Sequence, residues 1–182
     1  MKVINDFENI QASSGEFSRL EPNGYICRIT LADDFPFDEK TGKGDYLKIE
    51  YDIAEGEFKD YFKEQFEQFG YWSGRFFRSY KEKAQGMFKH FIDCVEKSNA
   101  GYSWNWDEGT LQGKLIGLVI GEEEYENQAG EVKVRLYVKD IKTVEDIKNG
   151  NFKVPSLKKL NKPTASEPSK EFTEVTDDDL PF

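Results

Sequence analysis

Strict alternation of apolar and polar residues is the feature that most constrains how this chain can fold. Between Asp45 and Ile53, apolar side chains occupy every second position, at Leu47, Ile49, Tyr51 and Ile53. A repeat of two residues is typical of a strand with one buried face. The same repeat predicts half-buried strands over Tyr25–Asp33 and Glu131–Lys142. The chain is therefore expected to be built mainly of β-strands.

The predicted strands assign particular side chains to the core. On the first strand the inward face carries Tyr25, Cys27, Ile29 and Leu31. On the last strand it carries Val132, Val134, Leu136 and Val138. A fourth strand, Leu111–Gly121, is apolar on both faces and is interrupted by glycines, as in a bent barrel strand.

Helical periodicity occupies the middle of the chain. Apolar residues recur at spacings of three and four over Phe58–Phe69 and over Ala84–Val95, which predicts two helices. Val144–Lys148 suggests one further short turn. Strands that flank inserted helices, with a closing hairpin at Asn127–Gly130, indicate a small β-barrel of the oligonucleotide-binding type, the OB-fold.

Two details of this barrel stay open. Its fifth strand is either Val3–Ile10 or Tyr71–Phe77, and Phe35–Gly44 is expected to be a hairpin loop. Residues 1–160 would form the OB-fold-like domain, with a helical insertion at about 57–98. Residues 161–182 lack an apolar period and are expected to be a disordered acidic tail.

Several classes of protein are excluded or disfavoured. No window reaches the roughly 18 uncharged apolar residues of a membrane helix, and no signal-peptide pattern opens the chain. Cys27 and Cys94 form no CxxC pair, which fits a reduced, cytoplasmic protein. Two cysteines and the single histidine, His90, offer no zinc-ligand spacing, and no glycine-rich phosphate motif occurs. We therefore expect no metal, no cofactor and no enzymatic activity.

The charge distribution limits where a nucleic acid could bind. The net charge is −10, so a nucleic-acid site must be a local patch. On Glu131–Lys142 the face opposite the valines carries Lys133, Arg135, Tyr137 and Lys139. Cations that follow phosphates, around a ring that stacks on a base for roughly 1–3 kcal/mol, suit a single-strand groove. The alternative is a solvated outer face whose lysines discourage edge pairing.

Two further segments interleave aromatic rings with cations or with each other. The first contributes Trp72, Arg75, Arg78, Tyr80 and Lys81, and the second contributes Trp104 and Trp106. Both could extend a stacking groove. Both could instead pack against the core, and tryptophan is mostly buried on average.

The end of the chain combines three carboxylates with an apolar terminus, in the order Asp177, Asp178, Asp179, Leu180, Pro181 and Phe182. A partner with an apolar pocket and a basic rim would recognise both features. This tip resembles the tails of bacterial and bacteriophage single-stranded DNA-binding proteins, which end Asp-Asp-Asp-Ile-Pro-Phe. Leu180 stands where those tails have isoleucine.

Much of the body is similar to a phage-encoded family from Gram-positive hosts, associated with single-strand binding or recombination. The similarity lies in Phe58–Phe66 and in FKHFIDCVEKSN, WNWDEGTLQGKLIG and FKVPSLKKL. It implies sequence-independent binding of single-stranded DNA, with the tip recruiting replication or recombination proteins. The N-terminal strand signature of the bacterial proteins is missing, so their tetramer is not implied and a homo-oligomer stays open. The competing hypothesis is a phage adaptor that captures host proteins through the tail without binding DNA.

Overall fold

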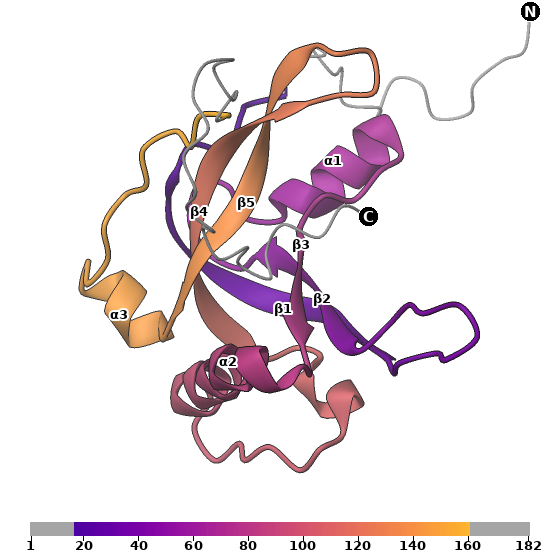
Figure 1. The fold of residues 1–182 in the computed structure, drawn as a ribbon. Helices are drawn as coiled ribbons and strands as arrows, with labels where there is room; N and C mark the ends of the chain where they lie inside the picture. Colours follow the sequence, from indigo (N-terminus) through magenta and orange to yellow (C-terminus); the bar gives the residue numbers. More distant parts are fainter. Residues whose placement is uncertain (1–16, 161–182) are drawn as a thin grey trace, which may run out of the picture.

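The computed structural model describes residues 17–160, which form a five-stranded antiparallel sheet with helices inserted between its strands (Figure 1). The strands are β1 (Asn23–Phe35), β2 (Tyr46–Ile53), β3 (Arg75–Ser79), β4 (Leu115–Glu126) and β5 (Val132–Lys142). The helices are α1 (Tyr61–Phe69), α2 (Gln85–Ser98) and α3 (Val144–Lys148), with short 3-10 turns η2 (Glu82–Ala84) and η3 (Glu108–Leu111). The predicted mainly β fold with inserted helices is confirmed, and β3 overlaps the Tyr71–Phe77 candidate for the fifth strand. The other candidate, Val3–Ile10, lies outside the described residues.

The sheet does not close into the predicted barrel. Its order is β3-β2-β1-β4-β5, so β3 and β5 are the two edges and do not pair with each other. Helix α2 contacts both edge strands. The ring of Phe91 lies edge-on to Phe76 of β3 at 5.7 Å, and His90 Nε2 lies 2.9 Å from the Ile141 carbonyl oxygen of β5. Side chains of a helix thus occupy the seam that a β3–β5 ladder would fill.

A bulge in β1 changes which residues face the core. The register with β2 shifts between Ile29 and Leu31. Beyond the shift Ala32 is buried and Leu31 is exposed, so the predicted inward position of Leu31 is wrong. Because the period of two is interrupted at the bulge, the outer half of β1 presents the opposite set of side chains.

The β4–β5 hairpin projects beyond the body of the sheet (Figure 1). Val132 and Val134, predicted to be in the core, are 46% and 39% exposed. Their cross-strand partners are Glu126 and Glu124, so the inward face of the hairpin is no longer apolar on both strands. Alternation places these valines on the core side of β5, but the core ends before it reaches them.

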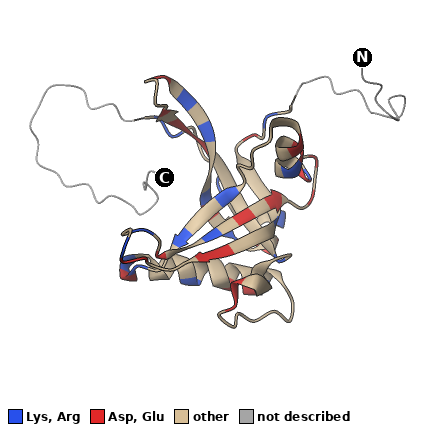
Figure 2. Ribbon diagram, turned by 90° about the vertical axis from the view of Figure 1, so that its right-hand side faces the viewer, with Lys and Arg blue, Asp and Glu red and all other residues tan. Residues whose placement is uncertain are grey.

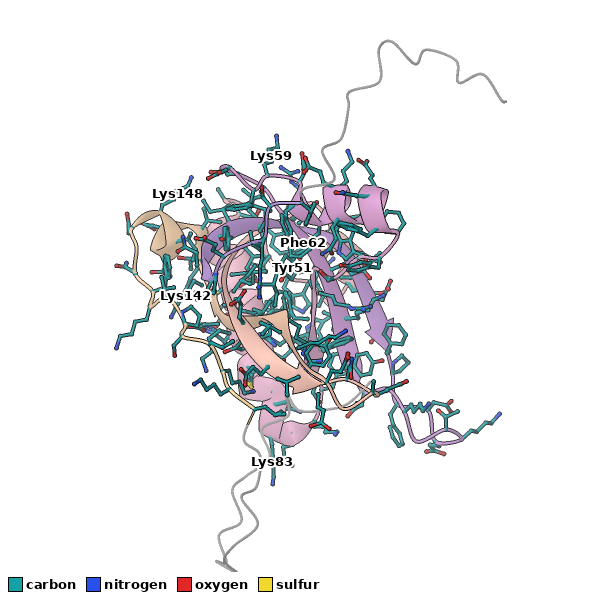
Figure 3. All side chains as sticks on the ribbon, turned by 90° about the horizontal axis from the view of Figure 1, so that it is seen from above. Tyr51, Lys59, Phe62, Lys83, Lys142 and Lys148 are labelled. Carbon is teal, nitrogen blue, oxygen red and sulfur yellow. The ribbon has the colours of Figure 1, made fainter. Side chains whose placement is uncertain are left out.

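Helix α1 is anchored by an aspartate on the strand before it. Asp52 is only 6% exposed, and its carboxylate accepts hydrogen bonds from the backbone N–H groups of Phe62 and Lys63 at 2.9 and 3.0 Å. These N–H groups belong to the first turn, which has no intrahelical acceptor for them. The ring of Phe62 then packs edge-on to Tyr51 at 5.2 Å, and both rings point into the interior between the sheet and α1 (Figure 3).

The chain after α3 runs back along the outer side of the β4–β5 half of the sheet. We call residues 151–160 the strap. Its Phe152 ring lies where a side chain on Gly24 would be, and Pro155 lies against Gly121. Lys158 then pairs with the edge of β4, donating its N–H to the Glu122 carbonyl oxygen at 2.9 Å. The strap is thus held to the sheet at three places.

Within residues 17–160, no helix combines the length and the apolar character needed to cross a membrane.

Candidate nucleic-acid interface

Three aromatic rings form a continuous row across the outward face of β1, β2 and β3. Phe35 of β1 is directly opposite Tyr46 of β2, and their rings are 5.2 Å apart with an interplanar angle of 24°. The Tyr46 ring meets Phe77 of β3 edge-on at 5.3 Å. Phe35 is 38% exposed, so the end of the row is open to solvent. We call this row, with the neighbouring Lys48 and Arg75, the stacking face.

The cations of the stacking face lie within a mixed-charge row. Lys48 Nζ lies 2.8 Å from Asp33 Oδ2 and 3.3 Å from Glu50 Oε1, and 5.8 Å from the centroid of the Phe35 ring. The hydrogen bond with Asp33 is the main cause of the raised pKa of Lys48, which therefore stays protonated. Arg75 is exposed and stands opposite Glu50 in the ladder. The strands that face the viewer in Figure 2 accordingly show basic and acidic positions side by side.

Most of this face was not identified from the sequence. Phe35 was expected to be in a hairpin loop, but it is the last residue of β1. Tyr46 and Lys48 lie within residues 31–58, which hold nine acids and three lysines, a composition that does not indicate a nucleic-acid site. The outward positions of β2 could be read from alternation. The strand register that places Phe35 and Phe77 beside these positions could not be predicted from the sequence.

The segment formed by β3 and the residues that follow it mainly serves packing. The Tyr80 hydroxyl donates to Asp34 Oδ1 at 2.6 Å and its ring meets Phe88 at 5.6 Å. Burial, followed by the hydrogen bond to Asp34, raises the pKa of Tyr80 well above its ordinary value. The Arg78 guanidinium lies over the Phe76 ring at 4.9 Å and is half-buried. Of the predicted residues in this segment, Arg75 and Lys81 are the exposed ones.

The three tryptophans differ sharply in their surroundings. Trp72 is half-buried and donates its indole N–H to the Gly74 carbonyl oxygen at 3.0 Å. Trp104 is half-buried, and its backbone N–H donates to Glu96 Oε1 at 2.7 Å. Trp106 is 83% exposed and has a φ of 64°, a left-handed conformation that is uncommon for a side chain of this size. It thus presents most of its ring to solvent from a constrained backbone position.

Neighbouring acids largely neutralise the predicted binding strip on β5, which consists of Lys133, Arg135, Tyr137 and Lys139. Arg135 Nε lies 2.8 Å from Glu123 Oε1, and Lys133 Nζ lies 3.4 Å from Glu131 Oε2. Tyr137 is half-buried, and a side chain on Gly121 would contact both its ring and Pro155. Figure 2 shows the basic and acidic segments next to each other along this hairpin. Cross-strand pairing with Glu123 decides this outcome for Arg135, whereas Lys133 pairs with Glu131, two residues before it in the chain.

Lys139 differs from the other residues of that strip in its pairing with β4. Val119 pairs with Asp140 and Ile120 pairs with Val138, so Lys139 has no directly opposite residue on β4. A bulge of this kind bends a strand and re-aims a side chain. Lys139 is exposed at this bulge, and the structure brings the predicted DNA-binding residues to several places instead of one groove.

The described residues also bear on catalytic and metal chemistry. No group of three or more His, Cys, Asp or Glu side chains in residues 17–160 is placed to hold a metal ion. Burial raises the pKa of Cys94 to about 11 and that of Cys27 well above its ordinary value, so both thiols stay protonated at neutral pH. The predicted partner-binding residues, from Asp177 to Phe182, lie outside the described part of the chain.

No protein-family model matches this chain, and no curated protein matches its sequence.

Proposed function

We propose that the protein binds single-stranded DNA without sequence preference, in phage DNA replication or recombination, and that the stacking face is its main contact surface. The observation that carries the proposal is the row of Phe35, Tyr46 and Phe77 across three adjacent strands. Successive unpaired bases can stack on such a row because every base has a flat π-face. Bases inside a duplex are already stacked on each other, so the row favours single strands.

The strand order supports a finer assignment of the fold. A sheet ordered β3-β2-β1-β4-β5 would become a closed five-stranded ring if its two edges paired. We interpret it as an OB-type barrel that is open between β3 and β5. Barrels of this type bind oligonucleotides on the face of their second and third strands and the adjacent loops. Most of the stacking face lies on those strands, and Phe35 lies beside them at the end of β1.

Several exposed groups would complete the contact. Arg75 and Lys81 can approach phosphates, and Trp106 can stack on a base from its loop before η3, a turn that contacts β1. Each phosphate contact releases condensed counterions and makes the affinity dependent on salt. Lys133 and Arg135 would have to exchange their carboxylate partners for phosphates, so we assign them a smaller contribution.

The tail would serve a separate purpose in this proposal. Asp177, Asp178 and Asp179 would steer approach to a basic surface on a replication or recombination protein, mainly through the association rate. Phe182 would insert into an apolar pocket of that partner. Removing Leu180–Phe182 should abolish capture of the partner while leaving DNA binding intact. A pull-down with full-length and truncated chains, beside a DNA titration of both, measures these two effects separately.

The central experiment is a titration with oligo(dT) followed by tryptophan fluorescence, because Trp106 is exposed. Phe35→Ala should weaken binding by roughly 1–3 kcal/mol if its ring stacks on a base. The matched control is Phe66→Ala, which removes a ring of α1 that is 52% exposed, against 38% for Phe35. Equal effects of the two substitutions would contradict the assignment to the stacking face.

The adaptor hypothesis has its own support in the chain. The net charge is −10, and acids pair with Lys48, Lys133 and Arg135. An adaptor needs the tail but not the stacking face. If the folded wild-type chain shows no binding to oligo(dT) at low salt and still captures partners through its tip, the adaptor is the better description.

A further inference from the structure

A basic surface lies on the outer side of the β4–β5 half of the sheet, away from the stacking face. It is an open hollow between β5 and the strap, lined by Val119, Lys139, Asp140, Lys142, Asn151, Phe152 and Lys153. Three lysines and one aspartate give the hollow a net positive charge of two. This stands out in a chain whose net charge is −10.

The lysines are brought together by three separate structural features. Lys139 sits at the bulge that leaves it unopposed on β4. Lys153 is positioned by Phe152, whose ring lies over Gly24. Lys142 is the last residue of β5 and stands 2.9 Å from Asp140 Oδ2, the one acid of the hollow. Their convergence thus depends on the bulge and the strap and does not follow from sequence neighbourhood.

The turn into the strap is also well fixed. Thr143 and Asp146 form a reciprocal capping box at the start of α3. The Asn151 backbone N–H donates to the Asp146 carbonyl oxygen at 2.8 Å. An ordered backbone holds the lysine stems in place, so less entropy is lost when an anion binds.

The chemistry of the hollow suits phosphate groups better than bases. Lys139 and Lys153 form no ion pair with any residue in 17–160, so neither has to release a carboxylate first. The Phe152 ring packs against Gly24 and is half-buried, which leaves little of it to stack on a base. Lysines around an amide side chain can bind phosphodiester oxygens of any sequence.

We propose that this hollow holds the phosphate backbone of a single DNA strand that is too long for the stacking face alone. The proposal rests on the proposed function and deepens it, because it makes binding dependent on strand length. A short strand would occupy the stacking face only. A long strand would continue around the sheet and add contacts with Lys139, Lys142 and Lys153.

The test compares two strand lengths on two double variants. The strands are oligo(dT) of about 6 nucleotides, within the range that one OB-type fold covers, and of about 30 nucleotides. The variant is Lys139→Gln with Lys153→Gln, and the matched control is Lys59→Gln with Lys97→Gln, which removes two exposed lysines elsewhere. Far-ultraviolet circular dichroism and thermal melting verify that both variants fold.

The expected result is a loss confined to the long strand. The variant should bind the long strand about tenfold more weakly. The slope of log affinity against log salt concentration should fall by about 1.4, because each of the two lost phosphate contacts contributes roughly 0.7. The control should change neither. Equal affinity of the variant and the wild type for the long strand would overturn the proposal, and so would an equal loss on both strands.

Two further outcomes separate this proposal from its alternatives. If Phe35→Ala weakens binding of both lengths while the lysine variant affects neither, the proposed function survives and this inference fails. If the wild type binds neither length, both fail. An arm with inorganic phosphate alone, followed by calorimetry, covers a site for small anions. Phosphate binding that the variant loses, with unchanged long-strand affinity, would overturn the assignment to DNA.

Discussion

The outward faces of the two halves of the sheet carry similar residues and differ in what those residues meet. On β5, Lys133, Arg135 and Tyr137 alternate with apolar positions, and on β2, Tyr46 and Lys48 do the same. Across the ladder from Tyr46 stands another ring, that of Phe35. Across from Arg135 stands a carboxylate, Glu123, and across from Tyr137 stands a glycine covered by the strap.

This difference shows that the composition of a strand face and its openness to a ligand have separate causes. Alternation within one strand decides which side chains share a face. Cross-strand partners then decide whether those side chains are open to a ligand or already engaged. On β5, Arg135 and Lys133 are exposed but already paired with carboxylates, and on β2 the cross-strand partner of Tyr46 is a second ring. The half within the acidic part of the sequence therefore offers the row of rings.

The largest expected effect tests the half of the sheet that carries the stacking face, which we call the aromatic half. Phe35→Ala combined with Tyr46→Ala removes two adjacent stacking rings, and we expect a loss of about 2–6 kcal/mol in binding to oligo(dT). Fluorescence anisotropy with a labelled strand measures it. If the folded double variant binds oligo(dT) as tightly as the wild type, the stacking face does not bind DNA and the two halves do not differ in this respect.

The second prediction concerns what holds the aromatic half in shape. Asp52→Ala leaves the buried N–H of Phe62 and the partly buried N–H of Lys63 without their acceptor, and we expect the free energy of unfolding to fall by about 2–3 kcal/mol. Urea denaturation measures this loss. Asp52→Asn, which keeps an acceptor oxygen, should recover part of the stability. If both variants are as stable as the wild type, the carboxylate does not anchor the helix.

The third prediction separates the two tyrosines. Tyr137→Ala should lower the free energy of unfolding by about 1–2 kcal/mol, since its half-buried ring lies against Gly121, which Pro155 also covers. Binding of oligo(dT) by the folded variant should change little. This reverses the expectation from sequence, which gave Tyr137 a stacking role and little part in folding. A large loss of affinity with unchanged stability would restore that earlier expectation.

The smallest expected effect comes from removing a carboxylate that pairs with the cations of the β4–β5 half. Glu123 lies 2.8 Å from Arg135 and 3.3 Å from Lys158, so Glu123→Gln removes the carboxylate that both cations share. We expect DNA affinity to rise about threefold and the salt dependence to steepen, because exposed ion pairs are worth about 0–1 kcal/mol. Glu126→Gln, on the inward face of the same hairpin, is the matched control. No change at Glu123 would mean that the strip lies off the DNA path.

The sequence predicted the elements better than their assembly. The alternation over Asp45–Ile53 and the three-to-four spacing over Ala84–Val95 each correspond to an element of the right type at nearly the right place. The errors occur where a residue's surroundings come from distant chain. Leu31 turned outward at a bulge whose partner is β2, and Val134 projects past the end of the core.

The site depended even more on distant contacts. Arg75 was identified in advance, and it does lie on the face that carries Tyr46. Phe35 and Phe77 are 42 positions apart in the sequence, and each looked like an ordinary loop or core residue until β2 was placed between them. Pairwise register across β1, β2 and β3 is what made a row of them.

By itself, then, the sequence determined local periodicity: which segments are strands or helices, which side chains alternate, and that the chain carries a net charge of −10. These follow from the geometry of the backbone and from simple counting. Only the tertiary structure decided that the sheet stays open at the β3–β5 seam, that Glu123 engages Arg135, and that Lys139 and Lys153 meet in one hollow. The physical reason is that pairing, burial and ion contacts depend on distances between residues far apart in the chain, and those distances exist only once the sheet has formed.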